Sequence, residues 1–359
     1  MKIGILTFHY AYNYGGILQA YALQEYLKSK GHIVEFVNYK NKSIKDYYQY
    51  VNLRRIPTNR LISCIKYVIT SLSRLPFRVV RYKRMIDFIE NNIVISSNEN
   101  LNRYDLIIVG SDQVWNIDIT GGFDAYYWGD MPSKKIVTYA ASFNKDYIPN
   151  SYISEIKKKL ANFNAISVRE DSLKDIFQPL TDKEIKVVLD PTLLAPVSIW
   201  NQFKHKMVLN RKYILVYALR DEDKLMSSLR LLQKETHLDY ILLRGAETWK
   251  YSKHIKQFAD PGDFVSLFQN AEYIITTSFH GTVFSILFHK LFYTLRCNDG
   301  NNSRVESLLK SIGLNNRLID KYPKGGYLQT INYTDVDKKL LAYRQQSIIY
   351  LDNICNEAE

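Results

Sequence analysis

The sequence predicts an α/β protein of two Rossmann-like domains, each built on a parallel sheet, that face each other across a cleft. Short apolar runs with strand character alternate with segments of helical period along the whole chain. With 359 residues the chain is also longer than a single ordinary core supports. Alternation of this kind with short links is typical of parallel sheets covered by helices.

The amino-terminal domain is expected to span residues 1–195. Its first helix, over residues 17–30, has apolar residues at helical spacing and ends at Gly31, a favoured residue just past a helix end. A second helix is expected over residues 77–92, and Ala195-Pro196-Val197 has the composition of a hinge. The strands of this domain are expected at residues 2–8, 33–38, 105–109, 136–142, 164–168 and 186–190.

The carboxyl-terminal domain is expected to span residues 196–359 and to repeat the same alternation. A last helix, over residues 334–353, is expected to cross back onto the first domain. The other elements are expected as strands at 213–219, 239–244, 273–277 and 291–296, and as helices at 222–236, 262–271, 281–289 and 303–312.

Composition indicates a cytoplasmic protein without metal or cofactor. The apolar run at residues 3–8 is too short for a secretory signal, and no run approaches the length of a membrane span. The three cysteines, Cys64, Cys297 and Cys355, lack the spacing of a zinc site or a disulfide framework. Histidine and carboxylate residues also show no ligand spacing.

Positive charge is concentrated in one insertion, residues 40–84. Twelve lysines and arginines stand there against Asp46 alone, which leaves +11 of the net charge of +12. With the apolar stretch at residues 61–72, this segment suits an anionic membrane surface, and the chain is expected to work at the inner membrane face. A solvated insertion explains the charge equally well. No nucleic-acid-binding motif accompanies it.

Residues 273–296 form the most informative segment of the chain. A buried strand ends in the polar turn Ser278-Phe279-His280-Gly281, and an apolar helix and a second strand follow. The turn therefore lies at the carboxyl edge of a parallel sheet, where open α/β folds bind ligands, beside a helix N-terminus suited to an anion. His280 is a candidate for acid–base chemistry or phosphate contact, although a capping histidine is the commoner role.

The amino terminus has the same construction, with a strand at residues 2–8 and the glycine-bearing loop HYAYNYGG at 9–16. This loop lacks the glycine spacing of a dinucleotide or P-loop site.

Six blocks in order along residues 1–310 make the chain resemble the polysaccharide pyruvyl transferase family. The blocks are NYGGILQAYALQ at 13–24, VGSDQVWN at 109–116, SVRE at 167–170, DPTLL at 190–194, SFHGTVFSILF at 278–288 and NSR at 302–304. The resemblance implies a GT-B-like fold. It also implies transfer of the enolpyruvyl unit of phosphoenolpyruvate onto two hydroxyls of a sugar, giving a cyclic pyruvate ketal. The acceptor would be a saccharide or a lipid-diphosphate-linked glycan, a precursor of a capsule or exopolysaccharide.

The donor requires cations, and four arginines are candidates. Arg304 precedes a helix and Arg169 follows a strand, while Arg220 and Arg244 each end a predicted strand of the second domain. Surface solvation, or for Arg169 a pair with Glu170 or Asp171, is the alternative. Other branches of the family carry arginine at the position of Ser278. If that arginine binds the donor in those relatives, either another cation holds the donor here or the donor differs.

The first domain supplies the candidate acceptor contacts. Asp112 follows the strand at 105–109 and could act as base on a sugar hydroxyl or cap the next turn. His9 is a second candidate for the proton role. Asn13, Gln19, Trp115 and Asn116 carry amides or an indole ring suited to sugars.

Two other functions remain open from the sequence. A glycosyltransferase of the same fold would place a nucleotide sugar at the same helix N-terminus. A basic protein without enzymatic activity would instead bind an anionic polymer or a membrane.

Overall fold

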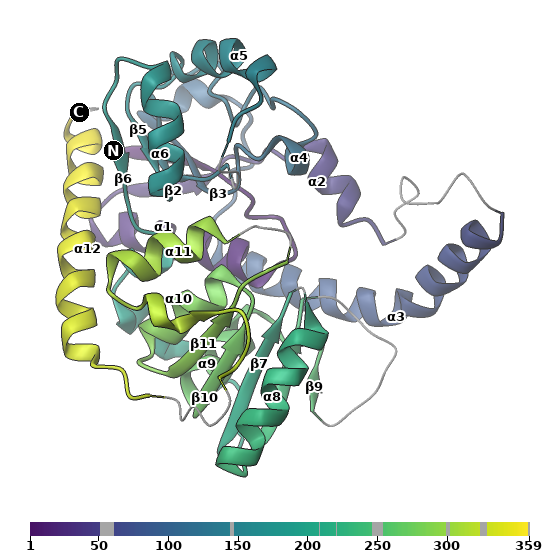
Figure 1. Cartoon of the computed structure of the whole chain (residues 1–359). Coiled ribbons are helices and arrows are strands. Elements are labelled where there is room, and N and C mark those ends of the chain that lie inside the picture. Colours follow the sequence, from purple (N-terminus) through teal and green to yellow (C-terminus); the bar gives the residue numbers. More distant parts are fainter. Residues whose placement is uncertain are drawn as a thin grey trace.

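The computed structural model describes residues 1–50, 61–143, 147–207, 209–219, 221–245, 254–298, 302–323 and 329–357. Within these ranges the chain forms two six-stranded sheets in which every strand pairing is parallel (Figure 1). Helices cover the sheets, so the strands are buried on both faces and their sequences are almost continuously apolar. This confirms the predicted fold class of two parallel-sheet domains with a GT-B-like arrangement.

The first sheet has the strand order β2-β1-β3-β4-β5-β6. The chain moves outward from β1 to β2 and then returns to the other side of β1 at β3, so its direction reverses between β1 and β3. The strands are β1 (Lys2–Leu6), β2 (Ile33–Phe36), β3 (Leu106–Asp112), β4 (Ile136–Ala141), β5 (Ile166–Val168) and β6 (Ile185–Val187).

The second sheet has the order β12-β11-β10-β7-β8-β9, with the corresponding reversal between β7 and β10. Two short edge strands, β9 and β12, were not predicted from the sequence. The strands are β7 (Tyr213–Ala218), β8 (Asp239–Arg244), β9 (Ile255–Lys256), β10 (Tyr273–Thr276), β11 (Leu291–Leu295) and β12 (Leu318–Ile319).

Helices fill the connections. Those of the first half are α1 (Tyr14–Ser29), α2 (Lys42–Tyr47), α3 (Leu61–Asn92), α4 (Ile117–Thr120), α5 (Asn150–Leu160), α6 (Asp171–Phe177) and α7 (Pro191–Leu194). Those of the second half are α8 (Glu222–Thr236), α9 (Pro261–Asn270), α10 (Phe279–Leu287), α11 (Ser303–Ser311) and α12 (Tyr333–Asn356).

The amino-terminal end of α1 packs against the second sheet's helices. The Tyr14 hydroxyl donates a hydrogen bond to the Ala259 carbonyl at 2.9 Å, and the Tyr14 ring stacks on Phe264 at 5.0 Å. One apolar cluster continues from β1 through α1 and α7 into α9, α10 and β7. The two sheets therefore share a core, which holds their carboxyl edges in a defined relation.

The last helix, α12, runs along both sheets (Figure 1). Its Tyr350 hydroxyl donates to the Thr138 carbonyl of β4 at 2.8 Å, and Arg344 Nε donates to the Leu193 carbonyl at 2.9 Å. These contacts place the carboxyl terminus of the chain against the first sheet.

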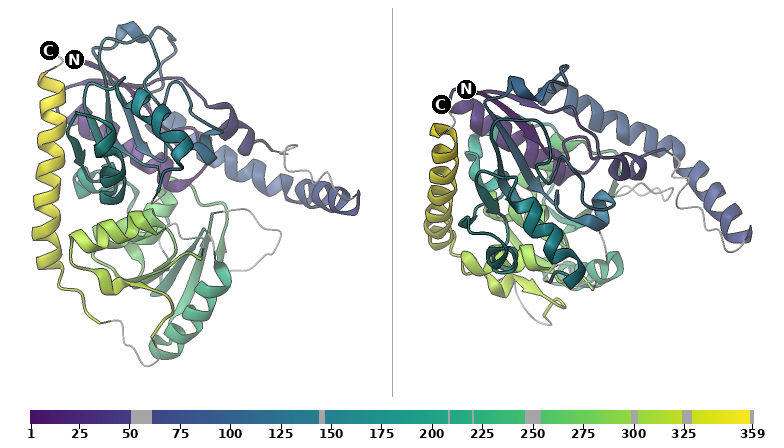
Figure 2. Two further views of the ribbon diagram at one scale, coloured as in Figure 1. Left: turned by 45° about the horizontal axis from the view of Figure 1, so that its top comes forward. Right: turned by 90° about the horizontal axis from the view of Figure 1, so that it is seen from above.

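The basic insertion contains α2 and the 32-residue helix α3. The sequence predicted a helix only over residues 77–92, but α3 begins at Leu61 and continues through Pro76. Its carboxyl-terminal half packs on the body, while its amino-terminal half projects outward (Figure 2). Within the described ranges, no helix combines the length and the apolar character that a membrane span requires.

Candidate functional site

The site lies where the two reversals of strand order face each other. In a parallel sheet, the connections that leave neighbouring strands in opposite directions open a crevice at their carboxyl ends. β1 and β3 form this crevice in the first sheet, and β7 and β10 form it in the second. The loop before α1, residue Asp112 and the turn at His280 therefore lie at the carboxyl edges of the two sheets.

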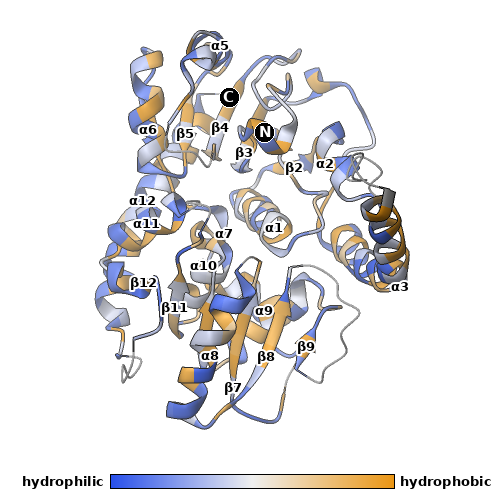
Figure 3. Cartoon of the chain, turned by 45° about the vertical axis from the view of Figure 1, so that its right-hand side comes forward, coloured by the Kyte–Doolittle hydropathy of each residue, from blue (hydrophilic) through white to orange (hydrophobic). Residues whose placement is uncertain are grey.

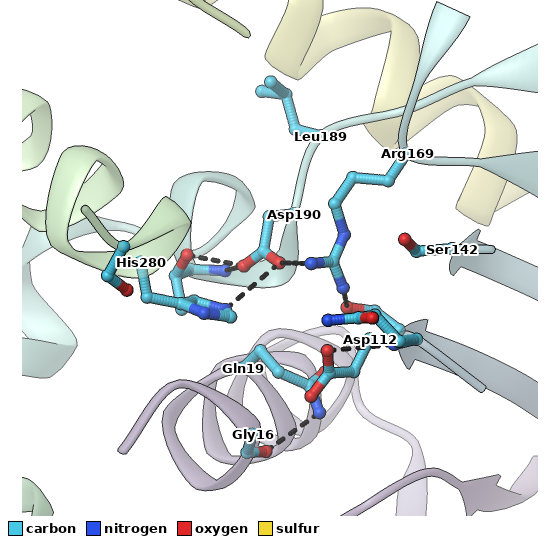
Figure 4. Close-up of polar contacts among 12 residues, drawn as sticks. Gly16, Gln19, Asp112, Ser142, Arg169, Leu189, Asp190 and His280 are labelled. Atoms are coloured by element: carbon cyan, nitrogen blue, oxygen red, sulfur yellow. Dashed lines mark hydrogen bonds and ion pairs between the residues drawn. The ribbon is translucent and has the colours of Figure 1, made fainter. Parts of the chain in front are cut away.

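Asp190 lies at the centre of a buried ionic cluster (Figure 4). One carboxylate oxygen, Oδ2, is 3.3 Å from Arg169 Nη1 and 3.5 Å from His280 Nε2. The other, Oδ1, accepts hydrogen bonds from the Thr192 amide at 3.0 Å and the Thr192 hydroxyl at 2.5 Å. The Asp190 side chain is fully buried. Its contacts bring together residues that follow the ends of β5, β6 and β10.

Asp190 is held as an anion in this cluster. Burial alone would raise the pKa of a carboxyl group, but Arg169, His280 and the Thr192 hydrogen bonds override it and hold the pKa of Asp190 well below its ordinary value. A buried anion fixed from two sides gives the His280 ring a defined orientation, since Nε2 faces the carboxylate.

The opposite edge of the His280 ring faces the start of α1. A Cβ atom added to Gly15 would lie 2.1 Å from His280 Nδ1, so only glycine permits this approach. His280 stands in the first turn of α10, where the Ser278 hydroxyl accepts from the Gly281 amide at 3.3 Å and caps the helix. The structure thus gives Ser278 a capping role and sets His280 between the two domains.

The first turn of α1 carries the polar residues expected on the acceptor side. Asn13 Oδ1 accepts from the Gly16 amide at 2.6 Å, and Asp112 Oδ2 would lie 3.2 Å from a Cβ at Gly16. Gln19 Nε2 donates to the Gly16 carbonyl at 2.9 Å and to the Thr7 hydroxyl at 3.1 Å. Asn13, Gln19 and Asp112 therefore gather around one helix N-terminus.

Two guanidinium groups line the neighbouring pocket. Arg169 and Arg304 lie over the Phe279 ring, at 5.2 Å and 5.5 Å from its centroid. Arg169 Nη2 also donates to the Ser111 hydroxyl at 2.9 Å. Arg304 reaches the first domain, because its Nη2 lies 3.1 Å from the Gln113 side-chain oxygen when that amide is turned toward it. The pocket is also lined by Asp171, Val187, Val188, Leu189, Asp190, Leu193, Ser307, Leu308, Ser311 and Tyr343.

Glu170 adds a second buried carboxyl group beside these arginines. Burial raises the pKa of Glu170, although Arg169 and Arg304 counteract the increase. The Ser142 hydroxyl donates to its Oε1. Arg169 itself pairs with Asp190 across the cluster, whereas the sequence suggested Glu170 as its alternative partner.

Asp190 and Gly15 had no assigned role in the sequence interpretation, although both lie in the family blocks at 190–194 and 13–24. The position of Asp190 at a strand end could have identified it. The proximity of Gly15 to His280 could not have been found from sequence, because the two residues meet only through domain packing.

Three expected site residues, Trp115, Asn116 and Arg244, have structural roles. Trp115 is fully buried, donates from Nε1 to the Tyr127 carbonyl at 2.8 Å and stacks on Trp128, so neither ring face is open to a sugar. Asn116 caps α4 through the Asp118 amide. Arg244 pairs with Glu222 at 2.7 Å. Arg220 lies outside the described residues.

His9 is fully buried, and its Nδ1 lies 3.2 Å from the Thr7 carbonyl. Burial lowers its pKa to about 4, with a smaller contribution from Lys40. His9 is consequently neutral at physiological pH and packs against Phe36. Among the residues that the structure describes, no group of three or more histidine, cysteine or carboxylate side chains could hold a metal ion.

Solved structures of similar overall fold share little sequence with this chain. UDP-N-acetylglucosamine 2-epimerase from Rickettsia bellii is 11% identical, with 99% of this chain and 97% of that chain covered and a TM-score of 0.48. UDP-GlcNAc 2-epimerase from Neisseria meningitidis bound to UDP-GlcNAc is 13% identical, with coverage of 97% and 94% and a TM-score of 0.47. No curated protein sequence matches the chain.

The family model of polysaccharide pyruvyl transferases matches residues 13–299. This span includes the first turn of α1, Asp112, Asp190 and the His280 turn, and it covers well over half of the chain. The chain therefore belongs to the polysaccharide pyruvyl transferase family.

Proposed function

We propose that this transferase moves the enolpyruvyl unit of phosphoenolpyruvate onto two hydroxyls of a sugar and forms a cyclic pyruvate ketal. The observation that carries the proposal is the junction of Arg169, Asp190 and His280 beside Arg304. Phosphoenolpyruvate brings a carboxylate and a phosphate. A site for it needs cations, helix N-termini and a group that can deliver a proton.

The cations and the proton donor come from different elements. Arg304 stands in the first turn of α11, and His280 stands in the first turn of α10. Both helices have nine residues, and a helix N-terminus of this kind favours a bound anion. We assign the donor phosphate and carboxylate to Arg304 and to the α10 amides, with the positive charge of the buried Arg169 in the pocket wall.

The chemistry requires one proton to reach carbon. In our scheme His280 donates a proton to the methylene carbon of phosphoenolpyruvate, which becomes a methyl group. The first sugar hydroxyl attacks the adjacent carbon and gives its proton to Asp112. The second hydroxyl then displaces phosphate, and its proton leaves with that group. Asp190 is a positioning residue here, because its buried carboxylate faces Nε2 at the edge of the His280 ring.

The acceptor is assigned to the first domain. Asn13 and Asp112 lie at the start of α1 and offer an amide and a carboxylate of the kind that bind sugar hydroxyls. Gln19, expected here from the sequence, is fully buried and its Nε2 donates to Thr7 and Gly16, so it supports the loop instead. A capsule, exopolysaccharide or glycolipid precursor made on the cytoplasmic side of a membrane fits the family and is part of this proposal.

Ligand-induced shifts of the melting temperature test the donor. Phosphoenolpyruvate should stabilise the protein on its own, since a ligand at 100 times its Kd adds about 2.7 kcal/mol of stability. UDP and GDP sugars should not. The product test is a gain of one pyruvate less water on a glycan acceptor. Stabilisation by a nucleotide sugar and not by phosphoenolpyruvate would instead indicate a glycosyltransferase.

A further inference from the structure

We propose that the outer face of α3 docks onto an anionic lipid bilayer. The proposal rests on the proposed function only for its purpose, which is to hold the site close to a membrane-borne acceptor. The exposure, the charge and the placement of this helix favour such docking.

The exposed face of α3 is apolar over five turns. Ile62 is 81% exposed and Ile69 is 62% exposed. The other exposed residues of this stretch follow at spacings of three or four residues, so they lie on the same side of the helix. The exposed residues of this stretch are Ile62, Ile65, Lys66, Ile69, Leu72, Ser73, Pro76, Val79, Val80 and Lys83. Seven of these ten are aliphatic or proline, whereas a solvated helix face is normally polar.

This apolar stripe is large for a surface in contact with water. Residues 62–83 of a helix extend over roughly 30 Å. The stripe begins on the half of α3 that projects from the body and continues onto the half that packs on it (Figures 2 and 3). Its residues remain exposed, so no other described element covers it. Exposed apolar surfaces of this length usually mark a binding surface.

The charges around the stripe favour an anionic partner. Lys66, Arg74, Arg78 and Lys83 lie on or beside it, and no aspartate or glutamate occurs from residue 47 to residue 86. A second copy of α3 in an antiparallel or parallel pair would bring these positive charges together. A leaflet that contains anionic lipids instead attracts the lysines and arginines and accepts the aliphatic side chains among its acyl chains.

The carboxyl-terminal half of α3 contacts residues beside the candidate site, so docking of the helix would position the cleft. Arg84 Nη2 is 3.1 Å from Asp263 Oδ2 of α9, and Arg81 lies over the Tyr14 ring at 5.6 Å and is almost fully buried. Tyr14 is the residue before Gly15, which contacts His280. A bilayer that holds the projecting half of α3 thereby holds the first turn of α1 at a defined distance.

The test compares three variants in flotation with vesicles of phosphatidylcholine, with and without phosphatidylglycerol. The stripe variant, Ile62→Ser with Ile65→Ser and Ile69→Ser, changes three of the seven apolar residues of the stripe. The charge variant, Lys66→Gln with Lys83→Gln, removes charge from two exposed positions. The matched control, Ile33→Ser with Leu341→Ser and Ile349→Ser, changes three exposed aliphatic residues outside α3. Arg81 and Arg84 stay unchanged in every variant because both hold α3 to the body.

We expect the wild type and the control to bind only the vesicles that contain phosphatidylglycerol, and to release them at high salt. The stripe variant should lose at least about tenfold in partitioning, and the charge variant about thirtyfold at low salt. Equal flotation of the stripe variant and the control would overturn the proposal. So would a dimer of the wild type, seen by sedimentation, that the stripe variant abolishes while neither protein binds vesicles. Stabilisation by phosphoenolpyruvate, measured on the same variants, reports separately on the proposed function.

Discussion

Replacing Gly15 by alanine places a methyl group between the two domains at the point where they meet over His280. The added Cβ would lie 2.1 Å from His280 Nδ1 and 2.6 Å from Cγ. An ordinary contact is about 3.4 Å or longer, so the ring must move by roughly 1 Å or the domains must separate. Asp190 holds the other edge of the ring, so either movement breaks the alignment of His280 with the crevice.

A displacement of about 1 Å from a productive geometry lowers turnover on the order of a hundredfold. Stability should change much less. Gly15 is the second residue of α1, so alanine there stabilises the helix by less than the roughly 1 kcal/mol of an interior position and offsets only a small part of the steric cost. The expected result is therefore a folded enzyme with a melting temperature close to that of the wild type and with turnover reduced about a hundredfold.

The assay is single-turnover pyruvyl transfer combined with thermal unfolding for Gly15→Ala, His280→Ala and the double variant. If Gly15→Ala acts through His280, it should have little further effect when His280 is already alanine. Gly16→Ala is the graded control, because its Cβ would be 3.0 Å or more from Asn13 and Asp112 and needs only a small adjustment. Turnover of Gly15→Ala within twofold of wild type, or additive losses in the double variant, would refute the reasoning.

Four other outcomes are expected. His280→Ala should lower turnover about a hundredfold or more while the melting temperature changes little, and a variant that keeps its activity would remove His280 from the proton role. Arg304→Ala should weaken the stabilisation by phosphoenolpyruvate, whereas Arg244→Ala, which removes only a surface pair, should not; equal shifts in both would place the anion site elsewhere. Asp190→Asn should lower the free energy of unfolding by about 3–5 kcal/mol, because it leaves the buried Arg169 guanidinium without its anion. The pKa of Asp190 is lower in the folded state than in the unfolded state. The difference in the free energy of unfolding between wild type and Asp190→Asn, measured by urea unfolding, should therefore persist above about pH 4 and become smaller at lower pH. The pKa of His9 is lowered to about 4, so protonation favours the unfolded state, and wild type should lose up to about 3 kcal/mol between pH 7 and 4 relative to His9→Gln.

The sequence by itself determined the elements and the ends of strands that carry chemistry. Strands β7, β8, β10 and β11 lie within a residue or two of the predicted ranges, because apolar runs and the turns that bound them are encoded over a few neighbouring residues. The same local signals identified the His280 turn and Asp112 as strand-end residues. Parallel topology then brings such residues to one edge of a sheet whatever the details of packing.

Tertiary structure decided which of those residues meet. Asp190 and His280 are 90 positions apart, and their contact depends on how two sheets share a core through α1. Trp115 looked suited to a sugar but fills the core, because a strand-end residue can turn inward as easily as outward.

The basic insertion shows the same division between local pattern and packing. Its charge was evident in the sequence, yet Arg81 and Arg84 are used inside the protein, against Tyr14 and Asp263. The apolar stripe of α3 became visible only when the helix was seen to begin at Leu61 and to project from the body. Composition records how many charged and apolar groups a segment holds, whereas the fold determines which of them remain in contact with water.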